Sequence, residues 1–130
     1  MVNETQMTQT NSQPEEKHFD LIVAIVNKGY TDIIMQAAKS KGARGGTTFS
    51  ARGTGNKELG SFYGIAIEPE KDVAFIVVET KIRDDVLLAI YKEAGLETKG
   101  VGIAFSVSLT DVVGLDDAMK ETIDKISKEE

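Results

Sequence analysis

The sequence contains no cysteine, no tryptophan and a single histidine among its 130 residues. Without cysteine the chain has no disulfides, no thiol nucleophile and no thiolate metal site, which fits a reducing cytoplasm. His18 alone cannot supply a histidine-based catalytic triad or a two-histidine metal site. We therefore expect a cytoplasmic protein that is not an enzyme and holds no metal.

Aromatic residues and excess positive charge are scarce as well. The chain has five phenylalanines and three tyrosines, and its formal net charge is −6. Binding to phosphate backbones needs clustered lysine and arginine, and base stacking needs aromatic side chains, so nucleic acid is not an expected partner. No apolar run approaches the roughly 20 residues of a membrane span. The polar N-terminus lacks the apolar segment of a signal peptide, so neither insertion in a membrane nor export is expected.

The length fits a single domain behind a short tail. Residues 1–17 show no hydrophobic periodicity and are expected to be a disordered tail. Residues 18–130 are expected to form one domain that ends in a helix over about 115–128. The narrow apolar stripe of that helix consists of Met119, Ile123 and Ile126.

The pattern of apolar residues predicts an α+β fold. Residues 19–26 and 73–78 are short, nearly continuous apolar runs, typical of buried strands, and residues 102–108 form a last strand. Residues 47–52 and 62–68 alternate between the two faces of a strand. One helix is expected to end at Gly42, and a second to start at Asp84 and Asp85 and end at Gly95. The order βαββαβ is that of a ferredoxin-like domain, an antiparallel sheet with both helices on one face.

Two glycine clusters lie beside predicted strands: the cluster at 53–55 follows the strand at 47–52, and the cluster at 100–102 leads into the last strand. Glycine allows backbone N–H groups to approach and hold an anion such as a phosphate. The alternative is structural, since glycine also serves mobile loops and tight turns. Arg52, Lys71 and Lys99 flank the clusters and carry charges suited to phosphate oxygens.

Five segments, taken in order, resemble the PII (nitrogen regulatory) family between residue 19 and about residue 115. These segments are 20–28 (DLIVAIVNK), 42–48 (GARGGTT), 51–55 (ARGTG), 100–107 (GVGIAFSV) and 111–115 (DVVGL). They are similar, respectively, to the first strand of the family, the turn into its second strand, the strand end before its T-loop, its B-loop with the last strand, and the start of its C-loop.

The resemblance implies a ferredoxin-like homotrimer that binds ADP or ATP in clefts between subunits. Such a protein regulates a partner, for example a membrane transporter or an enzyme, by contact. By position, Ile25, Thr47 and Ile76 would line an adenine pocket, and Lys71 matches a lysine at the base of the T-loop. With the flanking cations included, the predicted nucleotide-binding residues are Ile25, Thr47, Arg52, Gly53, Thr54, Gly55, Lys71, Ile76, Lys99, Gly100, Val101, Gly102 and Ile103.

The chain departs from the family at cations that bind phosphate. Val101 and Ile103 stand where the B-loop of the family usually carries an acidic residue and a lysine. Gly114 and Asp116 stand where its C-loop usually carries two arginines. Each charge-assisted contact is worth roughly 1.5–3 kcal/mol, so the affinity for ATP is expected to fall unless other cations substitute.

The segment in the place of the T-loop, between Gly55 and Pro69, is shorter than in the family and has no tyrosine at its middle. Uridylylation and sensing of 2-oxoglutarate are therefore not expected. Two alternatives to an ADP or ATP sensor remain: a sensor of a cyclic dinucleotide, or a structural trimer that interacts with its partner without any nucleotide.

Overall fold

A computed structural model of the chain describes residues 17–53, 61–62, 65–66, 70–115 and 120–128. The elements of the main domain are β1 (Phe19–Asn27), α2 (Thr31–Ser40), β2 (Thr47–Arg52), β5 (Glu70–Glu79), α3 (Thr80–Glu93) and β6 (Gly102–Leu109). The other elements are β3 (Ser61–Phe62), β4 (Ile65–Ala66) and the C-terminal helix α4 (Lys120–Lys128).

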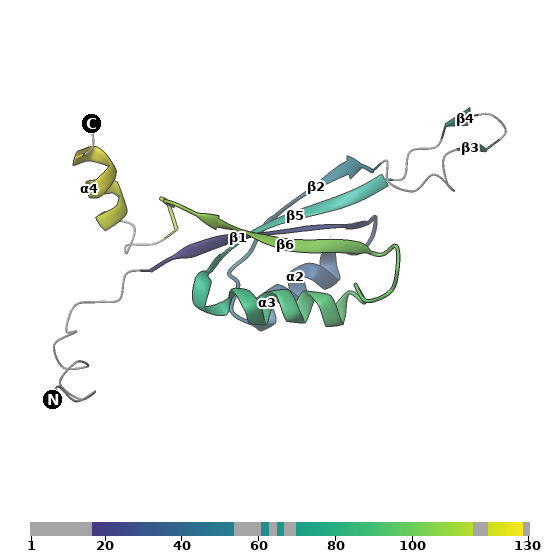
Figure 1. The fold of residues 1–130 in the computed structure, drawn as a ribbon, viewed down its shortest axis with the longest axis horizontal. Helices are drawn as coiled ribbons and strands as arrows, with labels where there is room; N and C mark the ends of the chain where they lie inside the picture. The colour runs from purple at the N-terminus through teal and green to yellow at the C-terminus, as the bar shows by residue number, and fades with distance from the viewer. Residues whose placement is uncertain (1–16, 54–60, 63–64, 67–69, 116–119, 129–130) are drawn as a thin grey trace, which may run out of the picture.

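The main domain is an antiparallel sheet with the strand order β2-β5-β1-β6. Both α2 and α3 cover the same face of this sheet, and no helix of the described residues lies on the opposite face (Figure 1). β3 and β4 form a separate two-stranded sheet that lies beyond the ends of β2 and β5 (Figure 1). The predicted ferredoxin-like α+β fold is thus confirmed.

The core lies between the sheet and its two helices. Alternate residues of β1 and β5 point toward the helices, because successive side chains of a strand face opposite sides of the sheet. The helices contribute apolar side chains from the faces that they turn toward the sheet. The fully buried side chains of this layer include Ile22, Val26, Ile34, Ile76, Val86 and Ile90.

The helix-free face of the sheet is apolar and open. Phe75 and Phe105 flank Val23 in one row across the sheet, and Phe49 lies in the next row on β2. Each of the three phenylalanine side chains is 40–44% exposed. The rings of Phe49 and Phe75 meet edge to face, with their centroids 5.1 Å apart. We call this surface the open face.

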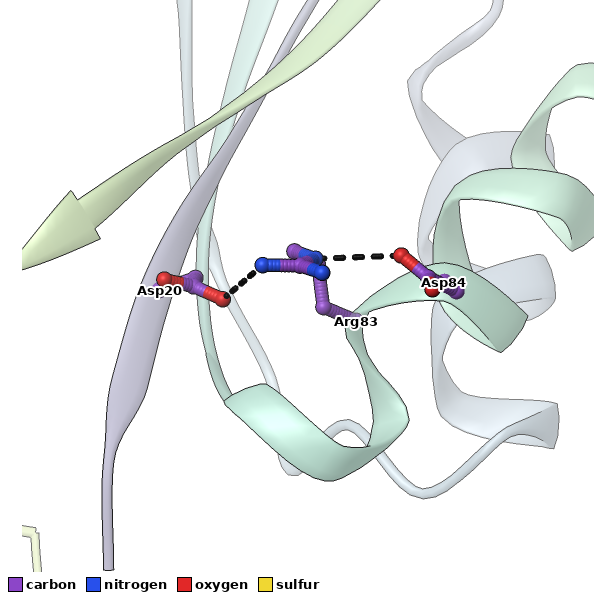
Figure 2. A network of polar contacts seen from close by, with 3 residues as sticks. All are labelled: Asp20, Arg83 and Asp84. Atoms are coloured by element: carbon purple, nitrogen blue, oxygen red, sulfur yellow. Dashed lines mark hydrogen bonds and ion pairs between the residues drawn. The ribbon is translucent and has the colours of Figure 1, made fainter.

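A buried ion pair ties α3 to the first strand. Asp20 is 2% exposed on the helix-covered side of β1, and one oxygen of its carboxylate lies 3.1 Å from Nη1 of Arg83. Figure 2 shows the guanidinium of Arg83 between Asp20 and Asp84. The carboxylate of Asp84 accepts a second hydrogen bond, from Nε of Arg83, at 3.1 Å. A buried carboxylate needs such a partner, because desolvation strongly penalises an unpaired charge.

The start of α3 differs from the expectation. The helix begins at Thr80, a full turn before Asp84 and Asp85. β5 runs directly into it: Glu79 is still extended, and the Thr80 N–H donates to the carbonyl of His18 at 2.8 Å. The prediction from the acidic pair was wrong because the strand-to-helix junction contains no loop that would have marked the boundary.

Other predicted boundaries agree more closely. Gly42 and Gly95 each directly follow the C-cap residue of their helix with a positive φ, of 107° and 69°, as expected of helix-ending glycines. The predicted strand over 62–68 is described only as the two short strands β3 and β4. The predicted tail lies outside the described residues except for Lys17, and the predicted C-terminal helix is described over Lys120–Lys128.

Candidate functional site

Four strand ends meet at one end of the sheet. β1 and β2 end there, and β5 and β6 begin there, as the pairing of Asn27 and Ala51 with Lys71 and of Val26 with Gly102 shows. Two predicted binding segments that are far apart in sequence reach this end of the sheet together with Lys71. One contains Arg52 and Gly53, and the other is 100–102. We call this region the strand-end site.

Asn27 links the parts of the strand-end site. The ammonium of Lys71 donates to its side-chain oxygen Oδ1 at 2.6 Å, and its Nδ2 donates to the carbonyl of Gly100 at 3.0 Å. The backbone N–H of Asn27 also donates to the carbonyl of Val101 at 3.0 Å. The sequence analysis missed this residue, although a polar side chain at the end of an otherwise apolar strand was an available signal.

Two glycines of the strand-end site lie where other atoms of the chain approach closely. A Cβ on Gly53 would lie 3.0 Å from Cε of Lys71, whose side chain crosses this α-carbon. A Cβ on Gly102 would lie 2.8 Å from the α-carbon of Val26 in the neighbouring strand. Gly100 has a φ of +90°, a conformation that side chains disfavour. Packing alone therefore explains part of the glycine pattern.

The charges of the strand-end site are not equally compensated. Lys28 and Glu70 form an exposed ion pair with 2.9 Å between Nζ and Oε2. The hydrogen bond and the charge of Lys28 lower the pKa of the Glu70 carboxyl, and Glu70 raises the pKa of Lys28 in return. Lys71 differs, because its hydrogen-bond partner is a neutral amide. Among the described residues, no carboxylate contacts the ammonium of Lys71 to neutralise its charge.

Thr47 lies away from the strand-end site. It begins β2, whereas Arg52 ends it, and six residues of strand extend over about 16 Å at roughly 3.3 Å per residue. Thr47 instead lines a cleft of about 640 Å³ with the 42–46 loop, the end of β5 and Gly114 and Leu115. Arg44 in this loop donates to the carbonyl of Leu115 at 3.4 Å. The predicted binding residues of one chain therefore fall into two groups at different ends of β2.

Three isoleucines were predicted near the nucleotide, and the structure separates them. Ile25 pairs with Ile103 on the open face, where Ile103 is 59% exposed. Ile76 pairs with Ile22 on the opposite face, beneath the helices, and is 0% exposed. Its side chain offers no surface to a ligand, which corrects the expectation that Ile76 lines an adenine pocket beside Ile25.

The remaining predicted residues are placed more simply. Lys99 is exposed in the turn before Gly100. Thr54 and Gly55 lie outside the described residues. Within the described ranges, no three His, Asp or Glu side chains are grouped so that they could hold a metal ion. In the same ranges, no helix has the length and apolar character needed to cross a bilayer.

A scan of the sequence against protein families matches residues 19–118 to the family described as Nitrogen regulatory protein P-II. The chain belongs to this family. PII proteins are trimeric regulators rather than enzymes; they bind small effector molecules and interact with partners. The chain is accordingly a PII-like signalling protein.

The fold of the chain is also found in a solved PII structure. The PII protein of Arabidopsis thaliana, in a crystal structure bound to citrate, superposes with a TM-score of 0.60 at 23% sequence identity. The match covers 77% of this chain and 82% of the plant protein. A comparison with curated protein sequences gives no match. At this identity the structural likeness establishes the shared fold.

Proposed function

We propose that this PII-like protein is a cytoplasmic sensor that binds ADP or ATP in the clefts between subunits of a homotrimer. Through the bound nucleotide it regulates a partner protein, such as a transporter or an enzyme, by contact and without catalysis. The observation that carries the proposal is the ammonium of Lys71, held by the neutral amide of Asn27 beside the glycine backbone of Gly53 and Gly100. A cation without a carboxylate partner, next to unshielded backbone, suits a phosphate group.

The separation of Thr47 from Lys71 supports a site built from two chains. A compact ligand that contacts both groups within one chain would have to extend along the whole of β2. In a trimer, the strand-end site of one subunit can instead face the cleft around Thr47 of the next. Arg44 and Lys81 belong to the cleft side, so the neighbouring subunit would add cations to the site.

The open face supports the trimer itself. Its phenylalanines at 49, 75 and 105, together with Ile103, form an exposed apolar surface over the strands of the sheet. Surfaces of this kind commonly serve as interfaces, since the burial of apolar area drives association. A trimer that joins these faces would also bring the strand-end site of one subunit toward the Thr47 end of β2 in the next subunit.

The missing family cations, at Ile103, Gly114 and Asp116, bear on the choice of ligand. A third phosphate adds negative charge, but the strand-end site has few cations to meet it. We therefore expect ATP to bind no more tightly than ADP. A site with a cation for each phosphate would instead bind ATP more tightly. A cyclic dinucleotide, with fewer charges for each adenine, remains the second candidate ligand.

The test is a thermal-shift series with ADP, ATP, AMP, cyclic di-AMP and 2-oxoglutarate, followed by calorimetry on each ligand that binds. A ligand at 100 times its Kd adds about 2.7 kcal/mol of stability. We expect a shift with ADP that Lys71→Met reduces and that Lys28→Met retains, because Lys28 is already paired with Glu70. No shift with any adenine nucleotide would refute the proposal and leave a trimer that interacts with its partner without a nucleotide.

A further inference from the structure

The side chain of Asn27 holds two segments of the strand-end site at once. Its oxygen accepts from Lys71 at the start of β5, and its nitrogen donates to Gly100 in the loop before β6. We propose that Asn27 is a positioning residue of the nucleotide site, which sets the place of the Lys71 ammonium and of the 98–102 loop together. This inference rests on the proposed function.

The chemistry of the amide suits this role. A carboxamide carries an acceptor and a donor on one rigid group, so one side chain can bind a cation and a carbonyl at the same time. An aspartate in its place would bind the lysine but could not donate to the Gly100 carbonyl. An alanine would do neither. Among common side chains of this length, only asparagine joins the two partners.

The backbone fixes where the amide stands. Asn27 is the last residue of β1; it pairs with Lys71 across the sheet, and its N–H donates to the Val101 carbonyl. The α-carbon of Asn27 is therefore fixed by backbone contacts on both sides, to β5 and to the loop before β6. Its hydrogen bonds reach partners that are 44 and 73 residues further along the chain.

Asn27 leaves Lys71 able to bind a ligand. An ammonium has three donors, and the bond to Oδ1 of Asn27 occupies one of them. The amide fixes the position of the charge without neutralising it, as a carboxylate would. The stem of Lys71 lies against Gly53, with Cγ 3.1 Å from the place a Cβ would take, so the lysine is held from both sides.

A ligand phosphate on Lys71 would then act on the loop through Asn27. A phosphate that fixes the ammonium of Lys71 also fixes Oδ1 of Asn27, which accepts from it. Nδ2, which donates to the Gly100 carbonyl, belongs to the same planar amide and is fixed with it. Loss of the hydrogen bond to Lys71 would therefore loosen the 98–102 loop, and loss of the hydrogen bond to Gly100 would loosen the ammonium of Lys71. The site would thus respond to a phosphate as one unit, although its two halves belong to different strands.

The experiment measures the affinities of ADP and of adenosine by calorimetry for the wild type, Asn27→Ala, Asn27→Asp and Lys71→Met, in the full chain. We expect Asn27→Ala to weaken ADP about tenfold and adenosine less than twofold, because one hydrogen bond to a charged group is lost. Asn27→Asp should weaken ADP further, since its carboxylate neutralises the lysine. The double variant Asn27→Ala/Lys71→Met should bind ADP no more weakly than Lys71→Met alone.

The control is Asp72→Ala. Asp72 accepts from the N–H of Gly29 at 3.0 Å and ties β5 to the turn after β1 at the same end of the sheet; among the described residues its side chain forms no hydrogen bond with Lys71 or Gly100. This variant should bind both ligands as the wild type does. If Asn27→Ala leaves ADP binding unchanged, or weakens ADP and adenosine equally, the inference is overturned while the proposed function stands.

A second measurement needs no ligand and also serves if Asn27→Ala does not fold. Hydrogen exchange of the 98–102 segment should be faster in Asn27→Asp and in Lys71→Met than in the wild type, and unchanged in Asp72→Ala. Equal exchange in all four proteins would refute the link between Lys71 and the loop. If the wild type binds no adenine nucleotide, the proposed function fails, and with it the role of Asn27 in ligand binding.

Discussion

Replacement of Arg83 by methionine would leave the carboxylate of Asp20 buried without its partner. The side chain of Asp20 is 3% exposed and that of Arg83 is 33% exposed. Removal of one partner of a fully buried pair costs about 3–5 kcal/mol, and the partial exposure of Arg83 reduces this to about 2–3 kcal/mol. Methionine keeps much of the apolar stem, so the loss reflects mainly the charge and its hydrogen bonds.

The assay is urea unfolding at one fixed protein concentration, because the stability of an oligomer depends on concentration. With a denaturant slope of about 2 kcal/mol per molar, we expect the midpoint to fall by about 1–1.5 M. Lys81→Met is the matched control: Lys81 lies in the same turn of α3 and pairs with Glu79, but its side chain is 75% exposed. An exposed pair contributes at most about 1 kcal/mol. Equal midpoints for the two variants would refute the role of the buried pair.

Two further predictions concern the sheet. Gly102→Ala should destabilise the protein by about 2–3 kcal/mol in urea unfolding, since the new Cβ would meet the backbone of β1, whereas Gly45→Ala, with nothing within 4 Å, should stay within about 0.5 kcal/mol. A stable Gly102→Ala would contradict the close approach of β6 to β1. Phe105→Asp should reduce the mass by light scattering from three chains to one chain of 14.1 kDa, and Leu88→Asp on α3, where the leucine is 51% exposed against 41% for Phe105, should not. A trimer of Phe105→Asp would show that the open face is not the interface.

Much of the fold could be predicted because local patterns and tertiary packing agree. The apolar run at 19–26 became the central strand β1, and the alternation at 47–52 became β2 with the same bounds. Gly42 and Gly95 marked helix ends because a positive φ at these positions is a local requirement. The start of α3 was misplaced because β5 runs into the helix without a loop, and the hydrogen bond at this junction joins Thr80 to His18, far away in sequence.

The candidate site was less predictable, for the same reason. Positions in the family register indicated Gly53, Lys71 and Gly100, and the structure brings them to one end of the sheet. That register assigned Ile76 to the adenine pocket, but the alternation of β5 turns its side chain under the helices. Asn27 went unnoticed because its significance lies in partners 44 and 73 residues away, which no local pattern reveals.

The sheet also gives the domain two ends of different character. Phe19, which begins β1, pairs with Leu109 at the close of β6, so the polypeptide enters and leaves the sheet at the same end. The strand-end site lies at the other end, about 26 Å away along the nine residues of β1. A fluorescent protein or affinity tag fused to either terminus would therefore join the sheet beside the cleft around Thr47, which Phe19, Gly114 and Leu115 line, so ligand affinities are best measured after removal of the tag.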